Sequence, residues 1–99
     1  MIQVLAILSV ADFDALDEFE TLAIGIINDY GGTLVSAFES SDFTEIHLLQ
    51  FPSEASFEEY QADSRLAKLT DLRLKAISAT KLYRSVKLKE YPLAHGRHL

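Results

Sequence analysis

An arginine interrupts the apolar stripe of the last predicted helix. At about 100° per residue, Arg73 falls on the inward face of a helix that starts near residue 65. The other members of this face are Leu66, Leu69, Ala76 and Ile77. A guanidinium held there can bind a carboxylate through two parallel hydrogen bonds. The position equally suits a structural salt bridge to Glu39 or Glu45, so two interpretations of Arg73 remain open.

A histidine and two tyrosines are further candidates for a site. His47 shares one face of a predicted strand with Glu45, so it could transfer protons near neutral pH beside a carboxylate. The plainer interpretation is a strand histidine held by a hydrogen bond, because no nucleophile accompanies it. Tyrosines at helical or strand spacing often belong to a core or an interface instead. We predict His47 as the catalytic residue, and we predict that Arg73, Tyr60 and Tyr83 bind the substrate.

Other kinds of catalytic chemistry lack the residues they need. The chain contains no cysteine, which excludes disulfides, thiol nucleophiles and Cys-ligated zinc. His95 and His98 form a lone H-x-x-H near the C-terminus, which is a weak metal signal without a third ligand. No serine lies in a G-x-S-x-G context, and no glycine-rich phosphate loop is present. We therefore predict no metal and no cofactor.

Length and composition predict one domain. The 99 residues are 48% hydrophobic, and we expect the domain to span residues 1–90 and a C-terminal tail to span residues 91–99. The apolar N-terminal stretch has no basic segment and reaches acidic residues within about ten positions, which is too short for a signal peptide or a membrane span. We therefore expect a cytoplasmic protein without a membrane partner.

The charges are distributed unevenly along the chain. The net charge is −6, the first Lys or Arg is Arg65, and thirteen of the fifteen acidic residues precede it. The basic residues are spaced through an apolar pattern instead of clustering, and the overall charge would repel phosphate backbones. This distribution predicts acidic and basic elements that lie side by side, and no nucleic-acid partner.

The first half of the chain predicts a strand, a helix and a hairpin. Residues 2–10 are apolar on both parities, which is typical of a central strand covered on both faces. A helix capped by Asp12 or Asp14 follows, and Gly31 suits its left-handed C-terminal position. Two strands at residues 33–40 and 43–51 are joined by a turn short enough for a hairpin.

The second half predicts a broken helix and an edge strand. Ser53 can cap a helix that starts at residue 54, with Ser56 as a competing cap, and residues 62–64 indicate a restart. Residues 81–89 alternate with lysines on one side, as expected for an edge strand. The complete order is that of the ferredoxin-like βαββαβ split βαβ fold, an α+β fold with an antiparallel four-stranded sheet and both helices on one face.

The other face of this sheet would expose an apolar row of the first strand. A patch of that kind is unusual on a small protein unless something covers it. The simplest cover is the same sheet of a second copy. We therefore predict a homodimer with a two-fold interface.

The segment from Phe51 to Arg73 resembles a small bacterial family of unknown function. The matching residues are F-P-S at 51–53, Tyr60, Ser64, Leu69 and Arg73, together with Y-G-G at 30–32. That family belongs to the dimeric α/β-barrel superfamily, which also holds antibiotic-biosynthesis monooxygenases, haem-degrading oxygenases and muconolactone isomerases. This chain departs from the family in having Leu66 where a tyrosine is usual, and a shorter segment between the second and third strands.

The resemblance implies a dimeric α/β barrel and a range of functions. One hypothesis is a metal-free oxygenase or isomerase of a small aromatic or conjugated acid, in which Arg73 orients the substrate and His47 moves protons. The second helix lacks the Asn, Trp and His set of the haem-degrading relatives, so we expect no haem. The alternative is a non-catalytic module that binds a small ligand or another protein. In either case we expect Arg73 to turn toward the sheet at the rim of a cavity.

Overall fold

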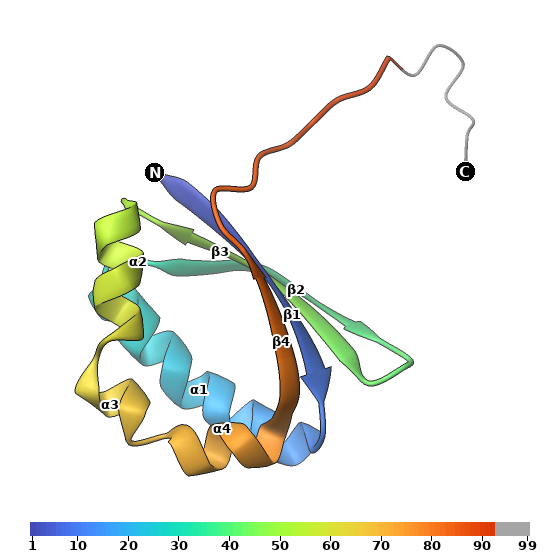
Figure 1. The fold of residues 1–99 in the computed structure, drawn as a ribbon, viewed down its shortest axis with the longest axis vertical. Coiled ribbons are helices and arrows are strands. Elements are labelled where there is room, and N and C mark those ends of the chain that lie inside the picture. Colours follow the sequence, from blue (N-terminus) through green and yellow to red (C-terminus); the bar gives the residue numbers. More distant parts are fainter. Residues whose placement is uncertain (93–99) are drawn as a thin grey trace.

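A four-stranded antiparallel sheet carries its helices on one face in the computed structural model, which describes residues 1–92 (Figure 1). The strands are β1 (Ile2–Val10), β2 (Thr33–Ser40), β3 (Thr44–Phe51) and β4 (Ile77–Tyr83). The helices are α1 (Phe13–Asp29), α2 (Glu54–Gln61), α3 (Ser64–Ala67) and α4 (Thr70–Ala76). The strand order is β2-β3-β1-β4, so the first and third strands are central. This confirms the predicted ferredoxin-like α+β fold.

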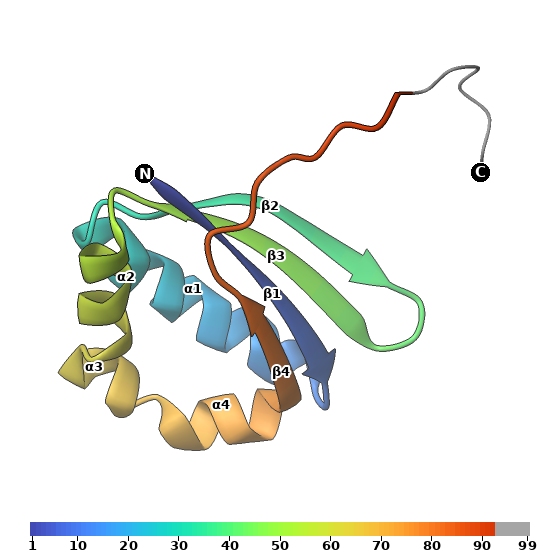
Figure 2. The ribbon, with the colours of Figure 1, turned by 45° about the horizontal axis from the view of Figure 1, so that its top comes forward.

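Strand β1 occupies the centre of the sheet because both of its faces are apolar. Val4 and Leu8 are buried beneath the helices, whereas Leu5 and Ile7 point to the opposite face. In the antiparallel register, β1 pairs with β3 on one side and with β4 on the other. Figure 2 shows no helix on the face that carries Leu5 and Ile7.

Helix α1 starts and ends where the sequence predicts. Asp12 is the N-cap, and its Oδ1 accepts a hydrogen bond of 3.0 Å from the backbone N–H of Ala15. Gly31 ends the helix with φ of 72°, a left-handed conformation that a side chain disfavours. The apolar side of α1 packs on the sheet.

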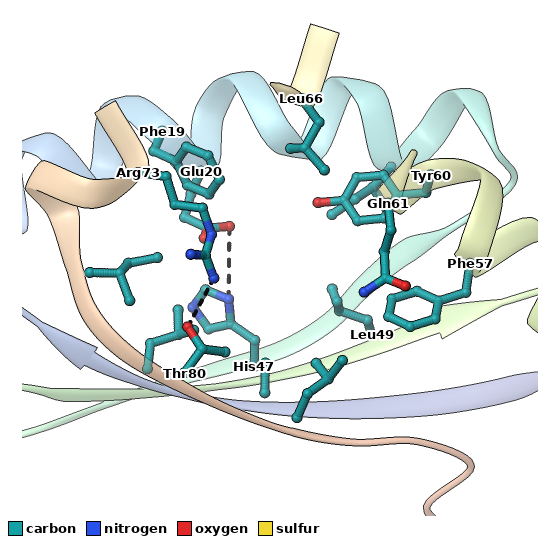
Figure 3. Close-up of a pocket in the computed structure, with 15 residues that line it drawn as sticks. Phe19, Glu20, His47, Leu49, Phe57, Tyr60, Gln61, Leu66, Arg73 and Thr80 are labelled. Atoms are coloured by element: carbon teal, nitrogen blue, oxygen red, sulfur yellow. Dashed lines mark hydrogen bonds and ion pairs between the residues drawn. The ribbon is translucent and has the colours of Figure 1, made fainter. Parts of the chain in front are cut away.

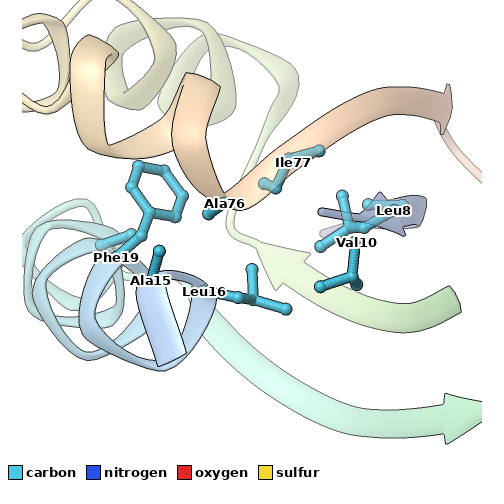
Figure 4. Packing of buried hydrophobic residues seen from close by; sticks show 9 residues of the cluster. Leu8, Val10, Ala15, Leu16, Phe19, Ala76 and Ile77 are labelled. Atoms are coloured by element: carbon cyan, nitrogen blue, oxygen red, sulfur yellow. The ribbon is translucent and has the colours of Figure 1, made fainter. Parts of the chain in front are cut away.

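The core consists of two clusters under the helices. The larger cluster joins β1 and the start of β4 to α1 (Figure 4). Its best buried members are Leu8, Ala15, Leu16, Phe19, Ala23, Ala76 and Ile77. The second cluster contains Val4, Ile27, Leu49, Phe51 and Phe57 and fixes α2 against β1 and β3. The two clusters together hold α1, α2 and α4 at fixed places above the sheet.

The predicted restart of the second helix is confirmed. Ser53 caps α2, with its Oγ accepting from the Ser56 backbone N–H at 3.1 Å. Helix α2 ends at Gln61, and Asp63 caps the short helix α3. Asp63 also accepts a hydrogen bond of 2.7 Å from the Tyr30 hydroxyl at the end of α1. Hydrogen bonds from Arg65 and Tyr30 lower the pKa of the Asp63 carboxyl.

Acidic α1 and the basic second half are neighbours, as the charge distribution predicts. Arg65 Nη1 lies 2.7 Å from Asp29 Oδ2, at the C-terminal end of α1. The same guanidinium pairs with Asp63 through Nη2, at 3.0 Å. These contacts link α1 to α3 and its N-cap.

The prediction of the last strand was wrong in its position. Residues 81–89 were expected to form it, but β4 spans Ile77–Tyr83. Ile77 pairs with Val10 of β1, and this long-range pairing overrides the local helical pattern that placed Ile77 at the end of a helix. Ser85 has φ of 53°, so the chain turns away soon after β4 ends. Beyond Ser85, the described part of the chain forms one hydrogen bond with β1. The Val86 N–H donates to the Gln3 carbonyl at 3.0 Å.

The chain leaves the body of the protein after this contact. Residues 87–92 extend away from the sheet and the helices in both views (Figures 1 and 2). The predicted weak metal motif at His95 and His98 lies outside the described residues. Across residues 1–92, no helix is long and apolar enough for a membrane span.

Candidate functional site

A cavity of about 180 Å³ lies between the helices and the sheet (Figure 3). Its polar side chains are Glu20, His47, Tyr60, Gln61, Arg73 and Thr80. Its apolar wall near α2 includes Leu49, Phe57 and Leu66. Gln61, Thr80 and Leu82 are exposed, so the cavity opens to solvent between the helices and β4. The cavity therefore has a polar end near Arg73 and an aromatic end near Phe57.

His47 is enclosed between two carboxylates. It is 4% exposed and stands on β3, on the face covered by helices. Its Nε2 lies 2.8 Å from Glu45 Oε1, and its Nδ1 lies 3.8 Å from Glu20 Oε2. Glu45 is two residues earlier on the same strand, so alternation places both side chains on one face. Glu45 therefore holds one nitrogen of the ring while the other faces the cavity and Glu20.

Glu20 is a site residue that the sequence did not predict. It lies on α1 and lines the cavity. Burial raises the pKa of its carboxyl, the charge of His47 opposes this, and the charge of Glu45 adds to it. The helical pattern contained a signal, because Glu20 falls about 40° from Leu16 on a wheel of 100° per residue, at the edge of the apolar face. An acid at such a position is either paired or functional.

Arg73 turns from α4 toward β4 at the rim of the cavity, in the position that the sequence predicts. Its Nη2 donates a hydrogen bond of 2.9 Å to Thr80 Oγ1. Among residues 1–92 no carboxylate forms an ion pair with it. The predicted alternative of a salt bridge to Glu39 or Glu45 is therefore not observed, because Glu45 is paired with His47 and Glu39 stands opposite Glu45 on β2, beyond β3. The guanidinium retains donors for a ligand.

Tyr60 reaches the cavity from α2, where it belongs to an aromatic cluster. Its ring lies 5.5 Å from the ring of Phe51, and the rings of Phe51 and Phe57 are 5.1 Å apart. Burial raises the pKa of the Tyr60 hydroxyl to about 12, with the charge of Glu20 adding to this effect and that of Arg73 opposing it. Tyr60 is therefore a hydrogen-bond donor at neutral pH.

Tyr83 does not join the other predicted residues. It pairs with Leu5 of β1 and lies beside Ile7 and Lys81 on the face of the sheet that no helix covers. Side chains alternate along β4, and its pairing with β1 turns Leu82, not Tyr83, toward the cavity. The structure thus brings together His47, Arg73 and Tyr60, and leaves Tyr83 on the opposite face.

Arg84 bridges the aromatic end of the cavity from outside. It follows β4, and its Nη2 donates a hydrogen bond of 3.1 Å to Gln61 Oε1 on α2. Its guanidinium carbon also lies 5.0 Å from the centre of the Phe57 ring. Arg73 and Arg84 therefore span the opening between the helices and β4 at two places.

No metal centre is formed by the part of the chain that the structure describes. Within residues 1–92 no group of three or more His, Asp or Glu side chains has an arrangement that could hold a metal ion. The side chains that line the cavity supply proton carriers, hydrogen-bond donors and a cation. This set can bind an anion and move a proton.

Several solved structures share this fold. An uncharacterised NIPSNAP domain protein from Burkholderia xenovorans has a TM-score of 0.70 and 14% identity, over 93% of this chain and 99% of its own. A protein from Agrobacterium tumefaciens has a TM-score of 0.70 and 20% identity, over 93% and 98%. A protein described as an antibiotic biosynthesis monooxygenase has a TM-score of 0.61 and 11% identity, over 90% and 100%.

The chain has the same fold as these proteins. At these identities the likeness concerns the fold and not the activity, and it agrees with the predicted resemblance to a superfamily that contains antibiotic-biosynthesis monooxygenases. No protein-family model matches the sequence, and no curated protein matches it. The cavity itself is therefore the basis for a functional proposal.

Proposed function

We propose that this protein binds a small aromatic or conjugated acid in the cavity and acts on it without a metal, as an isomerase or an oxygenase. The observation that carries the proposal is the convergence of His47, Arg73 and Tyr60 on one cavity. Arg73 supplies a cation at one end, and the aromatic cluster supplies an apolar surface at the other. An acid with an aromatic body satisfies both ends.

The size of the cavity supports a ligand with a single ring. A cavity of roughly 150 Å³ in another protein binds benzene. The cavity in this chain is about 180 Å³ and opens beside Arg73 and Thr80. Leu66 makes the wall apolar where the family that the chain resembles usually carries a tyrosine, which favours a ligand with one charged end and an otherwise apolar body.

We also infer that the active form is a homodimer. The face of the sheet without helices carries a row of Ile7, Ile46 and Phe38 across three strands, and a second row of Leu5 and Leu48. Phe38 is 64% exposed in the single chain. Apolar rows of this extent favour a partner surface, and the same face of a second copy matches them by symmetry.

A non-catalytic role in the same cavity is the alternative. A binding or interaction module would use Arg73 and the aromatic cluster but would not need proton carriers. The enclosure of His47 between Glu45 and Glu20 favours the catalytic form of the proposal. Turnover of a bound acid separates the two functions.

Ligand binding by Arg73 variants tests the proposal. Arg73→Met and Arg73→Lys should lose the paired hydrogen bonds to a carboxylate, which reduces the affinity for benzoate, phenylacetate and phenylpyruvate by about tenfold or more. Thermal shift and calorimetric titration measure this affinity. Lys75→Met is the matched control, because it removes an exposed cation from the same helix. Toluene lacks the carboxylate, so the Arg73 variants and the parent should bind it with similar affinity.

Two results would contradict the proposal. If the parent protein binds none of the acids, the assigned ligand class is wrong. If Arg73→Met is folded and binds the acids with the parent's affinity, then Arg73 does not hold the carboxylate and the site assignment fails.

A further inference from the structure

We propose that Glu20 is a catalytic residue and that the cavity tautomerises 2-oxo acids that carry an aromatic or other conjugated group. The reaction moves a proton between the carbon beside the ketone and the ketone oxygen. This inference rests on the proposed function, because it requires the acid to bind beside Arg73.

Two proton carriers from different elements face the same part of the cavity. Glu20 comes from α1 and His47 from β3, and Glu20 Oε2 lies 3.8 Å from His47 Nδ1 (Figure 3). Glu45 stands behind the ring, 2.8 Å from Nε2, and does not line the cavity. Glu45 is therefore a positioning residue, whereas Glu20 and His47 can both touch a ligand.

The surroundings of Glu20 suit a carboxylate base. The groups that face it are His47 and Glu45 on β3, Tyr60 on α2 and Arg73 on α4. Burial raises the pKa of Glu20 above its ordinary value of 4.5, which makes the carboxylate a stronger base. Proton transfer is most effective when the pKa of the base approaches the working pH.

The substrate class follows from what these groups can do together. A proton can leave a carbon only if that carbon is acidic, and a ketone next to it provides the acidity. In a 2-oxo acid the ketone is bonded to the carboxylate, so a carboxylate held by Arg73 places the ketone near His47 and Glu20. An aromatic group on the far carbon reaches toward Phe57 and Tyr60 and is conjugated with the enol that forms.

The proposed step conserves atoms and charge. The Glu20 carboxylate takes a proton from C3, the C–H electron pair forms the C2–C3 double bond, and the carbonyl π pair moves to the ketone oxygen. Protonated His47 gives its Nδ1 proton to that oxygen. The products are the enol, neutral His47 and protonated Glu20, and a proton passed from Glu20 to His47 across their contact restores the starting state.

Deuterium incorporation tests the role of Glu20. Phenylpyruvate is incubated with the full chain in D₂O, and the loss of the C3 proton signal is followed by NMR. The parent should accelerate this exchange over buffer, and Glu20→Gln should lower the catalysed rate by about a hundredfold or more while phenylpyruvate still binds. Glu18→Gln, the same change on the exposed side of α1, should exchange at the parent's rate. Glu20→Asp keeps a carboxyl and should retain more of the rate than Glu20→Gln.

The outcomes separate this inference from the proposed function. Bound phenylpyruvate that exchanges at the buffer rate, or a Glu20→Gln variant that exchanges as fast as the parent, overturns the role of Glu20 and leaves acid binding standing. Binding of the other acids without phenylpyruvate overturns the assignment of 2-oxo acids as substrates. Failure of every acid to bind contradicts the proposed function itself.

Discussion

Glu20 and Glu45 contact different nitrogens of the same imidazole, and the two contacts differ in length. Both acids contact His47, but Glu45 approaches from its own strand and Glu20 from a helix above. The short contact to Glu45 fixes the orientation of the ring, as a carboxylate does for many catalytic histidines. The longer contact to Glu20 leaves room for a ligand atom near both groups.

The titration of Glu20 should appear in the stability of the fold. Its pKa is raised in the folded chain, so the protonated carboxyl favours folding; this contribution is complete below pH 4.5 and is lost as the pH rises through the raised pKa. Glu20→Gln cannot lose it, so the stability of the variant relative to the parent should increase between pH 4.5 and pH 8. Each unit of the pKa difference corresponds to about 1.4 kcal/mol.

Urea unfolding at several pH values measures this effect. Glu18→Gln, on the exposed side of α1, controls for the loss of one charge from the helix. A Glu20→Gln variant whose stability relative to the parent stays constant or falls between pH 4.5 and pH 8 would show that the folded chain does not resist ionisation of Glu20.

At the scale of elements, the sequence predicted the order and most boundaries but not the exact place of β4. Caps at Asp12 and Ser53 and the left-handed Gly31 are local signals, and all three are confirmed. The start of β4 depends on pairing between Ile77 and Val10, which are distant in sequence, so no local pattern could reveal it. The same register decides that Leu82 and not Tyr83 meets the cavity.

The site was predictable to a similar extent. Arg73 and His47 stood out because a polar residue interrupts an apolar face, whereas Glu20 only borders the apolar face of α1 and was missed. Thr80 and Gln61 could not be found in this way, because their place at the cavity depends on how β4 and α2 meet across the opening.

The junction between α1 and β2 should tolerate no side chain at Gly32. A Cβ there would lie 2.6 Å from Phe51 Cε1 and 2.8 Å from Ile27 Cγ2, and both of these side chains are buried. Gly32→Ala should therefore destabilise the fold by about 1–3 kcal/mol, the usual cost of overpacking a core. Urea unfolding measures the change.

Gly25, within α1, provides the control. A Cβ added at Gly25 meets nothing within 4 Å, so Gly25→Ala should leave the stability unchanged or raise it by up to about 1 kcal/mol through helix propensity. Equal stability of Gly32→Ala and the parent would mean that Phe51 and Ile27 can move aside, against the close packing described for this junction.

For the whole molecule, the sheet separates the two surfaces to which we assign different roles. One face carries the helices and the cavity, and the other carries the apolar rows of Ile7, Ile46 and Phe38 and of Leu5 and Leu48. A dimer through the second face would leave the cavity opening free, because that opening lies between the helices and β4. If both proposals hold, we therefore expect that assembly and ligand binding can be changed independently.

A charge placed at the centre of the apolar rows should separate the dimer without emptying the cavity. Sedimentation equilibrium of the parent at micromolar concentration should give twice the chain mass of 11.1 kDa. Ile46→Lys puts an ammonium between Ile7 and Phe38, where a two-fold interface brings like charges together, so this variant should sediment as a monomer and still bind aromatic acids. Leu74→Lys, an exposed position on α4 that lies outside this face, should remain dimeric.

A parent that sediments at 11.1 kDa would rule out the homodimer, and an Ile46→Lys variant that stays dimeric would place the interface elsewhere on the molecule.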